Sequence, residues 1–378
     1  MKKIIFRKFL FDYLKFFLIA LISSATVIWV FQAVNFLDIM IEDGKDYFVY
    51  IKYSLLNYPK TISRIFIFVL FFSLYYVTIK YELNNELILF WNFGINKIKL
   101  VNFIFKISIF LTIFHIFLNS LVVPHTQIHA KSLLKTSEIN FFDNFIKGKK
   151  FNDTIKGLTI YAEEKDRNGD LKNLYIKREL DENQFQITYA KKGTFDIKGS
   201  IPLLVLYNGA TITSENSSVT NISFSKSDFS LANLKSNTVT YVKTQEMHSS
   251  KLIECIQNIY NLTNGQNSSK TIIENCNIKN IRNILKEVYK RFIIPFYIPV
   301  VSIISLMLIM LSKENPKYQK LKIIIFLIGF FIILFSETTS RLISNKIFEN
   351  FLLFLIPLLL IFLSYVFLLF KFNKIKKI

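Results

Sequence analysis

Apolar residues are gathered into six long blocks along the chain, with polar segments between them. The blocks lie at about 9–37, 54–79, 101–123, 291–311, 321–341 and 350–370. A helix needs roughly 20 apolar residues to cross the hydrocarbon core of a bilayer, and the blocks reach or approach that length. The pattern predicts six transmembrane helices. The first block is too long for a signal peptide and lacks a small-residue cleavage site, so we expect an uncleaved span.

Basic residues lie at those ends of the apolar blocks that share one side of the predicted membrane. Lysine and arginine are concentrated before the first span, between the second and third, between the fourth and fifth, and after the sixth. The loop at 38–52 belongs to the opposite side and carries four acidic residues and two lysines. Because basic loops stay in the cytoplasm, this bias places both termini there. The long segment 125–289 is then expected outside the cytoplasm.

The long polar segment has the pattern of a β domain. Short alternating runs such as "GLTIYAEE", "KNLYIKREL", "QFQITYA" and "NISFSK" are separated by turn signals that include Asn-Gly. Many short strands of this kind predict a sandwich, a barrel or a jelly roll. Residues 246–289 are polar with a helical pattern and lead into the fourth span. The predicted organisation is therefore 1–124 with three spans, 125–289 with the β domain and its linker, and 290–378 with three more spans.

Composition excludes several other functions. The formal net charge is +20, but the basic residues lie at the ends of apolar blocks and form no patch for nucleic acid. No P-loop, nucleophile elbow, zinc-protease motif or dinucleotide fingerprint is present, so we expect no catalytic residues. His125 and His129 share a helix face without a third ligand, and no metal site is expected. Cys255 and Cys276 can form a disulfide outside the cytoplasm or remain two free thiols.

Five short stretches resemble, in order, the LptF/LptG (YjgP/YjgQ) permease family. They are "QAVNFLDIMIEDG" at 32–44, "ELILFWNFG" at 86–94, "GLTIYAEEKDRNGDLKNLYI" at 157–176, "ITYAKKGTF" with "LLVLYNGAT" at 187–211, and "EVYKRFIIPFYIPV" at 287–300. The resemblance implies a helical membrane protein with a periplasmic jelly-roll-like domain in the bacterial inner membrane. It leaves open whether the chain is of the F or the G type, with "DIMIEDG" favouring F.

The resemblance also implies a function and partners. Such a chain is the membrane half of an ABC transporter that extracts lipopolysaccharide from the membrane and passes it to a periplasmic bridge. Its expected partners are a sister permease of the other type, an LptB-type ATPase dimer, LptC-type and LptA-type bridge proteins, and membrane lipids. The chain itself is then no enzyme and binds no cofactor, because ATP is used by the partner.

The segment between the second and third spans resembles the family's coupling helix, which contacts the ATPase. We expect this helix near 81–94. Glu86 occupies the position of the coupling glutamate, and the remaining expected contacts are Glu82, Phe90 and Trp91. Gly94 suits a C-cap. The alternative is a solvated amphipathic loop helix without a partner.

Relatives carry basic residues late in the first span, where they meet lipid phosphates, but residues 16–44 contain no lysine or arginine. Ala33 and Asn35 occupy the corresponding positions. Other cations are therefore the candidates for phosphate contacts: Lys60, Arg64, Lys45, Lys52 and Arg341. Lys60 and Arg64 share a helix face after Pro59, and a charge at membrane depth commonly faces a cavity or a partner. The alternative is that these side chains only extend to the headgroups.

Glu287, Arg291 and Pro295 match the E-x3-R-x3-P pattern of the family at the start of the fourth span. Because Glu287 and Arg291 can pair along one helix face, we expect them to anchor the structure there. Two other functions stay open on the residues alone. One is an envelope assembly or tethering protein that moves no lipid, and the other is a membrane-bound enzyme acting on an envelope lipid.

Overall fold

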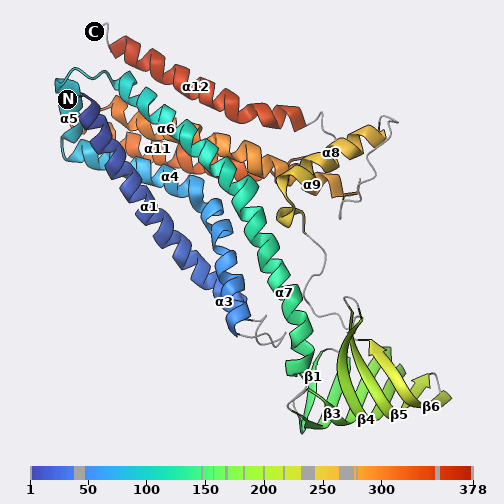
Figure 1. Cartoon of the computed structure of the whole chain (residues 1–378). Coiled ribbons are helices and arrows are strands. Elements are labelled where there is room, and N and C mark those ends of the chain that lie inside the picture. Colours follow the sequence, from blue (N-terminus) through green and yellow to red (C-terminus); the bar gives the residue numbers. More distant parts are fainter. Residues whose placement is uncertain are drawn as a thin grey trace. The chain divides into compact units, whose positions relative to one another are not determined.

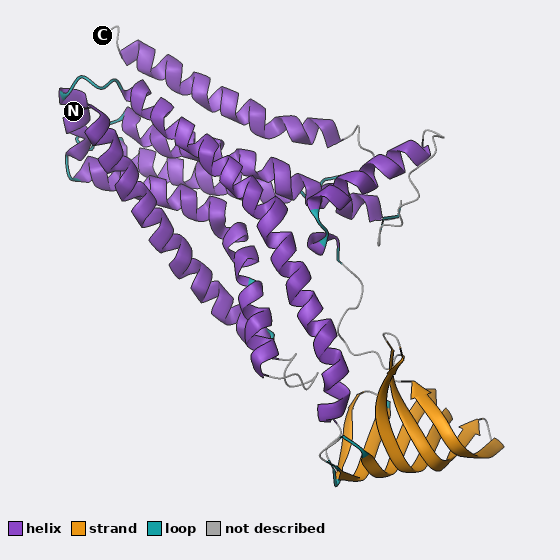
Figure 2. Ribbon diagram, viewed as in Figure 1, coloured by secondary structure: helices purple, strands orange, loops and turns teal. Residues whose placement is uncertain are grey.

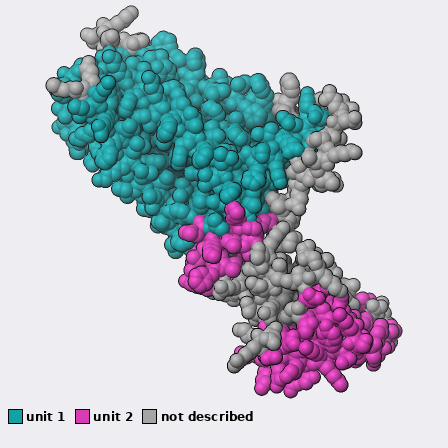
Figure 3. Space-filling view, in the orientation of Figure 1, with its two compact units in different colours: residues 1–31, 56–128, 242–378 teal, residues 32–55, 129–241 magenta. Residues whose placement is uncertain are grey.

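The computed structural model describes residues 2–37, 47–145, 148–155, 157–166, 169–181, 184–198, 201–215, 218–230, 243–263, 276–277, 280–344 and 350–375. The chain divides into two compact units (Figure 3). The first comprises residues 1–31, 56–128 and 242–378, and the second comprises residues 32–55 and 129–241. Helices form the first unit, and all the described strands belong to the second (Figure 2).

The helices of the chain appear in Figure 1. Their bounds are α1 Lys2–Asn35, α3 Tyr47–Leu56, α4 Tyr58–Leu83, α5 Glu86–Asn92, α6 Lys97–Phe117, α7 Val123–Phe145, α8 Ser249–Thr263, α9 Ile281–Val288, α10 Tyr297–Leu306, α11 Tyr318–Thr339 and α12 Phe351–Ile375. Within the described residues, six helical stretches are long and apolar enough to cross a membrane: Lys3–Asn35, Tyr47–Leu83, Lys97–Leu134, Ile281–Met310, Tyr318–Thr339 and Phe351–Phe372. The six predicted spans are therefore present.

The third span differs from the sequence prediction because it does not end at Pro124. The helix passes from α6 through a π-helical turn, η1 (Leu118–Val122), into α7. Pro124 lies in the first turn of α7, where a missing backbone N–H is tolerated. The segment after Pro124 is therefore helical as far as Phe145, and the first described strand begins at Lys150.

The fourth span forms the centre of the helical unit. In its most apolar stretch 78% of the residues are buried, against 11% for the sixth span and 17% for the first and fifth. The poorly buried spans expose Leu, Ile and Phe side chains, as lipid-facing helices do. The fourth span also begins earlier than predicted, at Ile281, because α9 continues into it.

Gly329 allows α11 to approach α4 closely. A Cβ atom at this position would overlap the ring of Phe71. Phe71 is itself fully buried within the core of the bundle. Small residues commonly allow such close helix contacts within membranes. The absence of a side chain at residue 329 is therefore a packing requirement.

The β domain is one antiparallel sheet of six described strands in sequential order. The strands are β1 Lys150–Ile155, β2 Leu158–Lys165, β3 Leu171–Asp181, β4 Gln184–Lys198, β5 Ile201–Glu215 and β6 Ser218–Ser230. One face holds an apolar core that includes Leu158, Ile160, Leu174 and Leu206. The predicted β domain is thus confirmed, and its strand order is that of a meander.

Two asparagines interrupt the alternation of this sheet. Asn173 and Asn208 have positive φ angles of 48° and 52°. In β3 the buried residues Leu171 and Leu174 are three positions apart instead of two, with Asn173 between them. The pairing register continues unchanged past both residues, so no extra residue is inserted. The strands of the sheet are curved (Figure 1).

Candidate functional site

The turn between the second and third spans contains a helix shorter than the sequence suggests. Residues up to Leu83 continue α4, and α5 begins only at Glu86 after a left-handed Asn85 (φ 62°). Gly94 ends α5 with φ 67°. The N–H of Ile95 donates to the Phe90 carbonyl at 3.0 Å, and the N–H of Gly94 donates to the Trp91 carbonyl at 2.9 Å. This is the glycine C-cap expected at Gly94.

Phe90 points into the protein. Its side chain is 2% exposed, and its ring lies 6.0 Å from that of Phe6 and 6.2 Å from that of Phe9, both on α1. The structure therefore places Phe90 in the core and not on a surface that a partner could reach. Trp91 is half-buried, with the Nζ atom of Lys97 5.5 Å from the centre of its ring.

The exposed large apolar side chains of α5 and its C-cap are Ile88, Leu89 and Phe93. Leu89 is the most exposed of them, at 53%. The sequence prediction named Phe90 and Trp91 instead of these residues. The helical period was the available signal, since positions 89 and 93 are four apart and lie away from the buried positions 87 and 90.

The two glutamates at this end of the bundle have different surroundings. Glu82 is 8% exposed, and its carboxylate accepts the backbone N–H of Lys313 at 2.8 Å. It therefore holds the loop between the fourth and fifth spans and belongs to α4 instead of α5. The side chain of Glu86 is 27% exposed, lies 3.5 Å from the Nζ of Lys8, and accepts a hydrogen bond from Asn84 at 3.3 Å. Glu86 is thus the acidic group that remains accessible on α5.

Basic side chains gather at the other end of the bundle, near α8. Lys60 donates to Gln127 at 3.2 Å, and Gln127 donates to Asn57 at 2.8 Å. Lys60 also lies within electrostatic range of the basic residues Arg64 and Lys243, and of the acidic residues Glu246 and Glu287. Arg64 and Lys243 are exposed. Lys60, Arg64 and Lys243 are called the basic cluster below. Sequence reasoning missed Lys243 because it is distant along the chain.

The other predicted cations have separate positions. Lys52 is exposed on α3, which belongs to the second unit. Arg341 is exposed just after the end of α11. Lys45 lies outside the described residues.

Arg291 is buried at the α8 end of the bundle, with Glu287 beside it. The Nε of Arg291 donates to Glu287 at 3.1 Å, and the Arg291 side chain is 3% exposed. Pro295 is buried in the short 3-10 turn η5 (Ile294–Phe296). The three residues of the E-x3-R-x3-P pattern therefore lie where the fourth span enters the bundle.

A disulfide joins Cys255 of α8 to Cys276, with their Cα atoms 5.8 Å apart. It ties α8 to the segment that leads into α9. The sequence left open whether Cys255 and Cys276 form a disulfide or remain free thiols, and the structure shows the disulfide.

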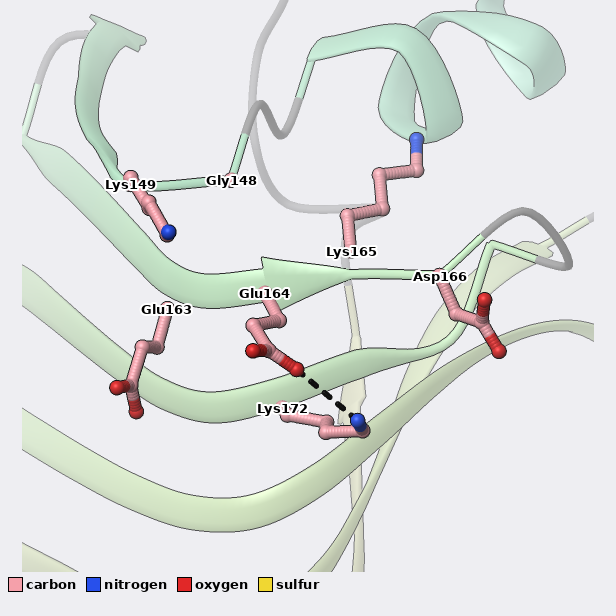
Figure 4. Close-up of a pocket in the computed structure, with 7 residues that line it drawn as sticks. All are labelled: Gly148, Lys149, Glu163, Glu164, Lys165, Asp166 and Lys172. Carbon is pink, nitrogen blue, oxygen red and sulfur yellow. Dashed lines mark hydrogen bonds and ion pairs between the residues drawn. The ribbon is translucent and has the colours of Figure 1, made fainter.

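A shallow polar depression lies on the β domain (Figure 4). Glu164 points toward Lys172 on the neighbouring strand, at 3.0 Å. This hydrogen bond and the lysine charge lower the pKa of the Glu164 carboxyl, and the same pair raises the pKa of Lys172. The depression is lined by charges of both signs, and such exposed pairs are common on protein surfaces. Across the described parts of the chain, no group of three or more potential metal ligands is found.

Comparison with known proteins shows the family to which the chain belongs. The sequence profile of the family described as "Lipopolysaccharide export system permease LptF/LptG" matches residues 7–371. The chain belongs to the LptF/LptG family. The match covers both sets of spans and the β domain, and it does not distinguish the F type from the G type. Together with the six apolar helices, it makes this LptF/LptG protein a multi-pass protein of the inner membrane.

A curated relative is "Uncharacterized protein RP871" from Rickettsia prowazekii (strain Madrid E). It is 20% identical over 207 residues, which are 54% of this chain and 57% of the relative. The chain therefore matches little more than half the length of that relative.

Proposed function

We propose that the chain is a permease subunit of an ABC transporter that extracts lipopolysaccharide from the inner membrane and passes it to a periplasmic bridge. The observation that carries this proposal is the family match over residues 7–371, which includes all six apolar helices and the sheet. A separate ATPase supplies the energy, and this chain binds no cofactor of its own. The sister permease completes the membrane part.

Two features, the charge distribution and the disulfide, support the proposed orientation in the membrane. Lysines cluster at the α5 end of the bundle, and basic loops stay in the cytoplasm. The paired Cys255 and Cys276 lie at the opposite end, and structural disulfides persist in oxidising compartments such as the periplasm. Both features support an orientation with α5 in the cytoplasm and with α8, which follows the β domain along the chain, in the periplasm.

In this orientation α5 is the contact with the ATPase. An accessible carboxylate, Glu86, lies beside exposed apolar side chains at Leu89 and Phe93. A short helix with such a surface suits a groove in a partner, where apolar side chains supply contact area and the carboxylate pairs with a basic group. The aromatic packing of Phe90 against α1 holds the helix in place.

The basic cluster is the proposed contact for the phosphates of lipid A. Arginine and lysine bind phosphate through charge-assisted hydrogen bonds. Lys60 is positioned by Gln127, while Arg64 and Lys243 are exposed and free to turn toward a ligand. In the proposed orientation, Lys60 and Arg64 belong to the periplasmic end of the second span, where the phosphates of outer-leaflet headgroups would be found.

The sheet is the proposed route toward the bridge. Its apolar face can hold acyl chains, and β6 pairs only with β5 among the described strands. β6 is 13 residues long and exposes Val219 and Ile222. A long edge strand of this kind can add a strand from another chain. We therefore assign the junction with the LptC-type and LptA-type proteins to β6.

Depletion of the protein in its native cells tests the transport function. Newly labelled lipopolysaccharide is followed into separated inner and outer membranes. A transport role predicts that the label accumulates in the inner membrane soon after depletion, before other envelope proteins are lost. An unchanged distribution of the label, with a disturbed envelope, would favour the tethering function instead.

A further inference from the structure

The fourth span has an unusual construction for a membrane helix. It consists of α9, the π-helical turn η4 (Tyr289–Ile293), the 3-10 turn η5, α10, and the 3-10 turn η6 (Met307–Met310). π-helical and 3-10 segments inside a helix often mark functional sites or hinges. This most buried span of the described bundle is thus a chain of short segments and not one uniform rod.

At its periplasmic end, the fourth span is fastened to the segment that follows the sheet. We call residues 243–248 the strap, because the chain passes from β6 through this segment to α8. The Arg291 side chain donates to the Gln245 carbonyl at 3.0 Å and to the Met247 carbonyl at 2.8 Å. It also donates to the Ser249 hydroxyl at 2.9 Å, at the start of α8. Arg291 itself lies within η4.

The hydrogen bonds around Arg291 also involve the third span and a carboxylate of opposite charge. The Ser249 hydroxyl donates to the Ser120 carbonyl at 2.8 Å, and Ser120 lies within the other π-helical turn, η1. Glu287 accepts from the Nε of Arg291 at 3.1 Å. A buried charge that loses its partners is strongly destabilising, so these contacts tend to form or break together. A lysine cannot reproduce the forked geometry.

At its cytoplasmic end, the fourth span is fastened to the region of α5. The Lys97 ammonium group donates to the Ile309 carbonyl at 2.7 Å and lies over the ring of Trp91 in α5. Glu82, the second-last residue of α4, accepts the backbone N–H of Lys313. Each contact joins the neighbourhood of α5 to the end of the fourth span or to the loop after it.

We propose that the fourth span carries movement of α5 to the strap, and that Arg291 is the positioning residue that connects the span to the strap. This inference rests on the proposed function, because α5 moves only if an ATPase binds it. The consequence is that the nucleotide state of the ATPase sets the position at which the chain from β6 enters the bundle. The fourth span would thus connect hydrolysis to the β domain.

The test uses the purified complex of this chain with its sister permease and ATPase. Hydrogen exchange of the strap amides is measured without nucleotide and with ATP and vanadate. We expect exchange of the wild-type strap to change between the two states by about tenfold or more, since hydrogen bonds to a charged group are among the stronger ones in proteins. Arg291→Lys should lose this difference while the ATPase still co-purifies. Ser249→Ala removes the two hydrogen bonds of this hydroxyl but keeps those from Arg291 to the Gln245 and Met247 carbonyls, so it should reduce the difference.

Arg282→Lys is the matched control, because Arg282 lies on α9 and donates instead to the Ile343 and Arg341 carbonyls. In Arg282→Lys, hydrogen exchange of the strap amides should change with nucleotide as it does in the wild type. The inference is overturned if the wild-type strap does not respond to nucleotide, or if Ser249→Ala and a folded Arg291→Lys both respond as the wild type does. Absence of any ATPase from the wild-type complex would contradict the proposed function instead.

Discussion

Glu86 on α5 lies 3.5 Å from Lys8 on α1, and both side chains are accessible to solvent. An exposed ion pair of this kind contributes only about 0–1 kcal/mol to stability. The pair therefore does little to hold α5, which is fixed by the burial of Leu87 and Phe90. Glu86 can consequently pair with a basic group of a partner, and only the weak ion pair with Lys8 is lost.

Reversal of the charge at Glu86 tests its role. Glu86→Lys should abolish co-purification of the ATPase, because the new cation would repel a basic group in the partner groove, while membrane insertion stays normal. Lys8→Ala is the matched control and should leave co-purification intact. Normal co-purification with Glu86→Lys, together with complementation of a depleted strain, would contradict the coupling role.

Exposed and buried apolar residues of α5 should behave differently. Leu89→Asp should weaken ATPase binding without changing the melting temperature, because Leu89 is exposed. Phe90→Ala should lower stability by about 3–5 kcal/mol, because it leaves a cavity among aromatic rings. Co-purification and thermal unfolding in detergent are the two measurements. A large loss of stability in Leu89→Asp would show that the exposed side chain packs against the protein itself.

The contact between α4 and α11 gives a prediction for packing. Gly329→Ala should lower the melting temperature, because the added methyl group overlaps the Phe71 ring, and overpacking costs about 1–3 kcal/mol. A smaller residue at position 71, such as Phe71→Leu, should restore part of the loss in the double variant. An unchanged melting temperature of Gly329→Ala would contradict this close contact.

The basic cluster predicts a salt-dependent affinity for lipid. Replacement of Lys60, Arg64 and Lys243 by alanine should weaken lipopolysaccharide binding by about tenfold or more, since each charged hydrogen bond contributes about 1.5–3 kcal/mol. Binding by the wild type should also fall with added salt. Lys172→Ala, which changes an exposed lysine of the sheet, is the control. Equal loss of binding in that control would mean that general charge, and not the cluster, attracts the lipid.

The disulfide predicts how thiol reagents react. In membranes from native cells, a maleimide reagent should label Cys255 and Cys276 only after reduction. Labelling without reductant would contradict both the pair and the periplasmic position of α8.

Much of this architecture follows from local sequence signals. The six spans depend on length and hydropathy, and the C-cap at Gly94 depends on one glycine. The strands of the sheet follow the alternation of apolar residues. These features are set by neighbouring residues, so the sequence alone predicts them.

The differences arise where distant segments meet. The helix expected near 81–94 is divided because Tyr81 is buried against Phe9 and donates to Asp12 at 2.5 Å, which keeps this part of the chain in α4. Lys243 approaches Lys60 only because the strap returns to the bundle after the sheet. These contacts join residues that are far apart in the sequence, so no local sequence pattern predicts them.

The central claim is that this chain is the membrane part of a lipopolysaccharide exporter. Affinity purification from native membranes in mild detergent, followed by mass spectrometry of proteins and lipids, tests it most directly. The account predicts that a cytoplasmic ABC ATPase, a second six-span permease and a lipid A species purify together with the chain. A preparation that contains the sister permease but neither ATPase nor lipid A would contradict the account.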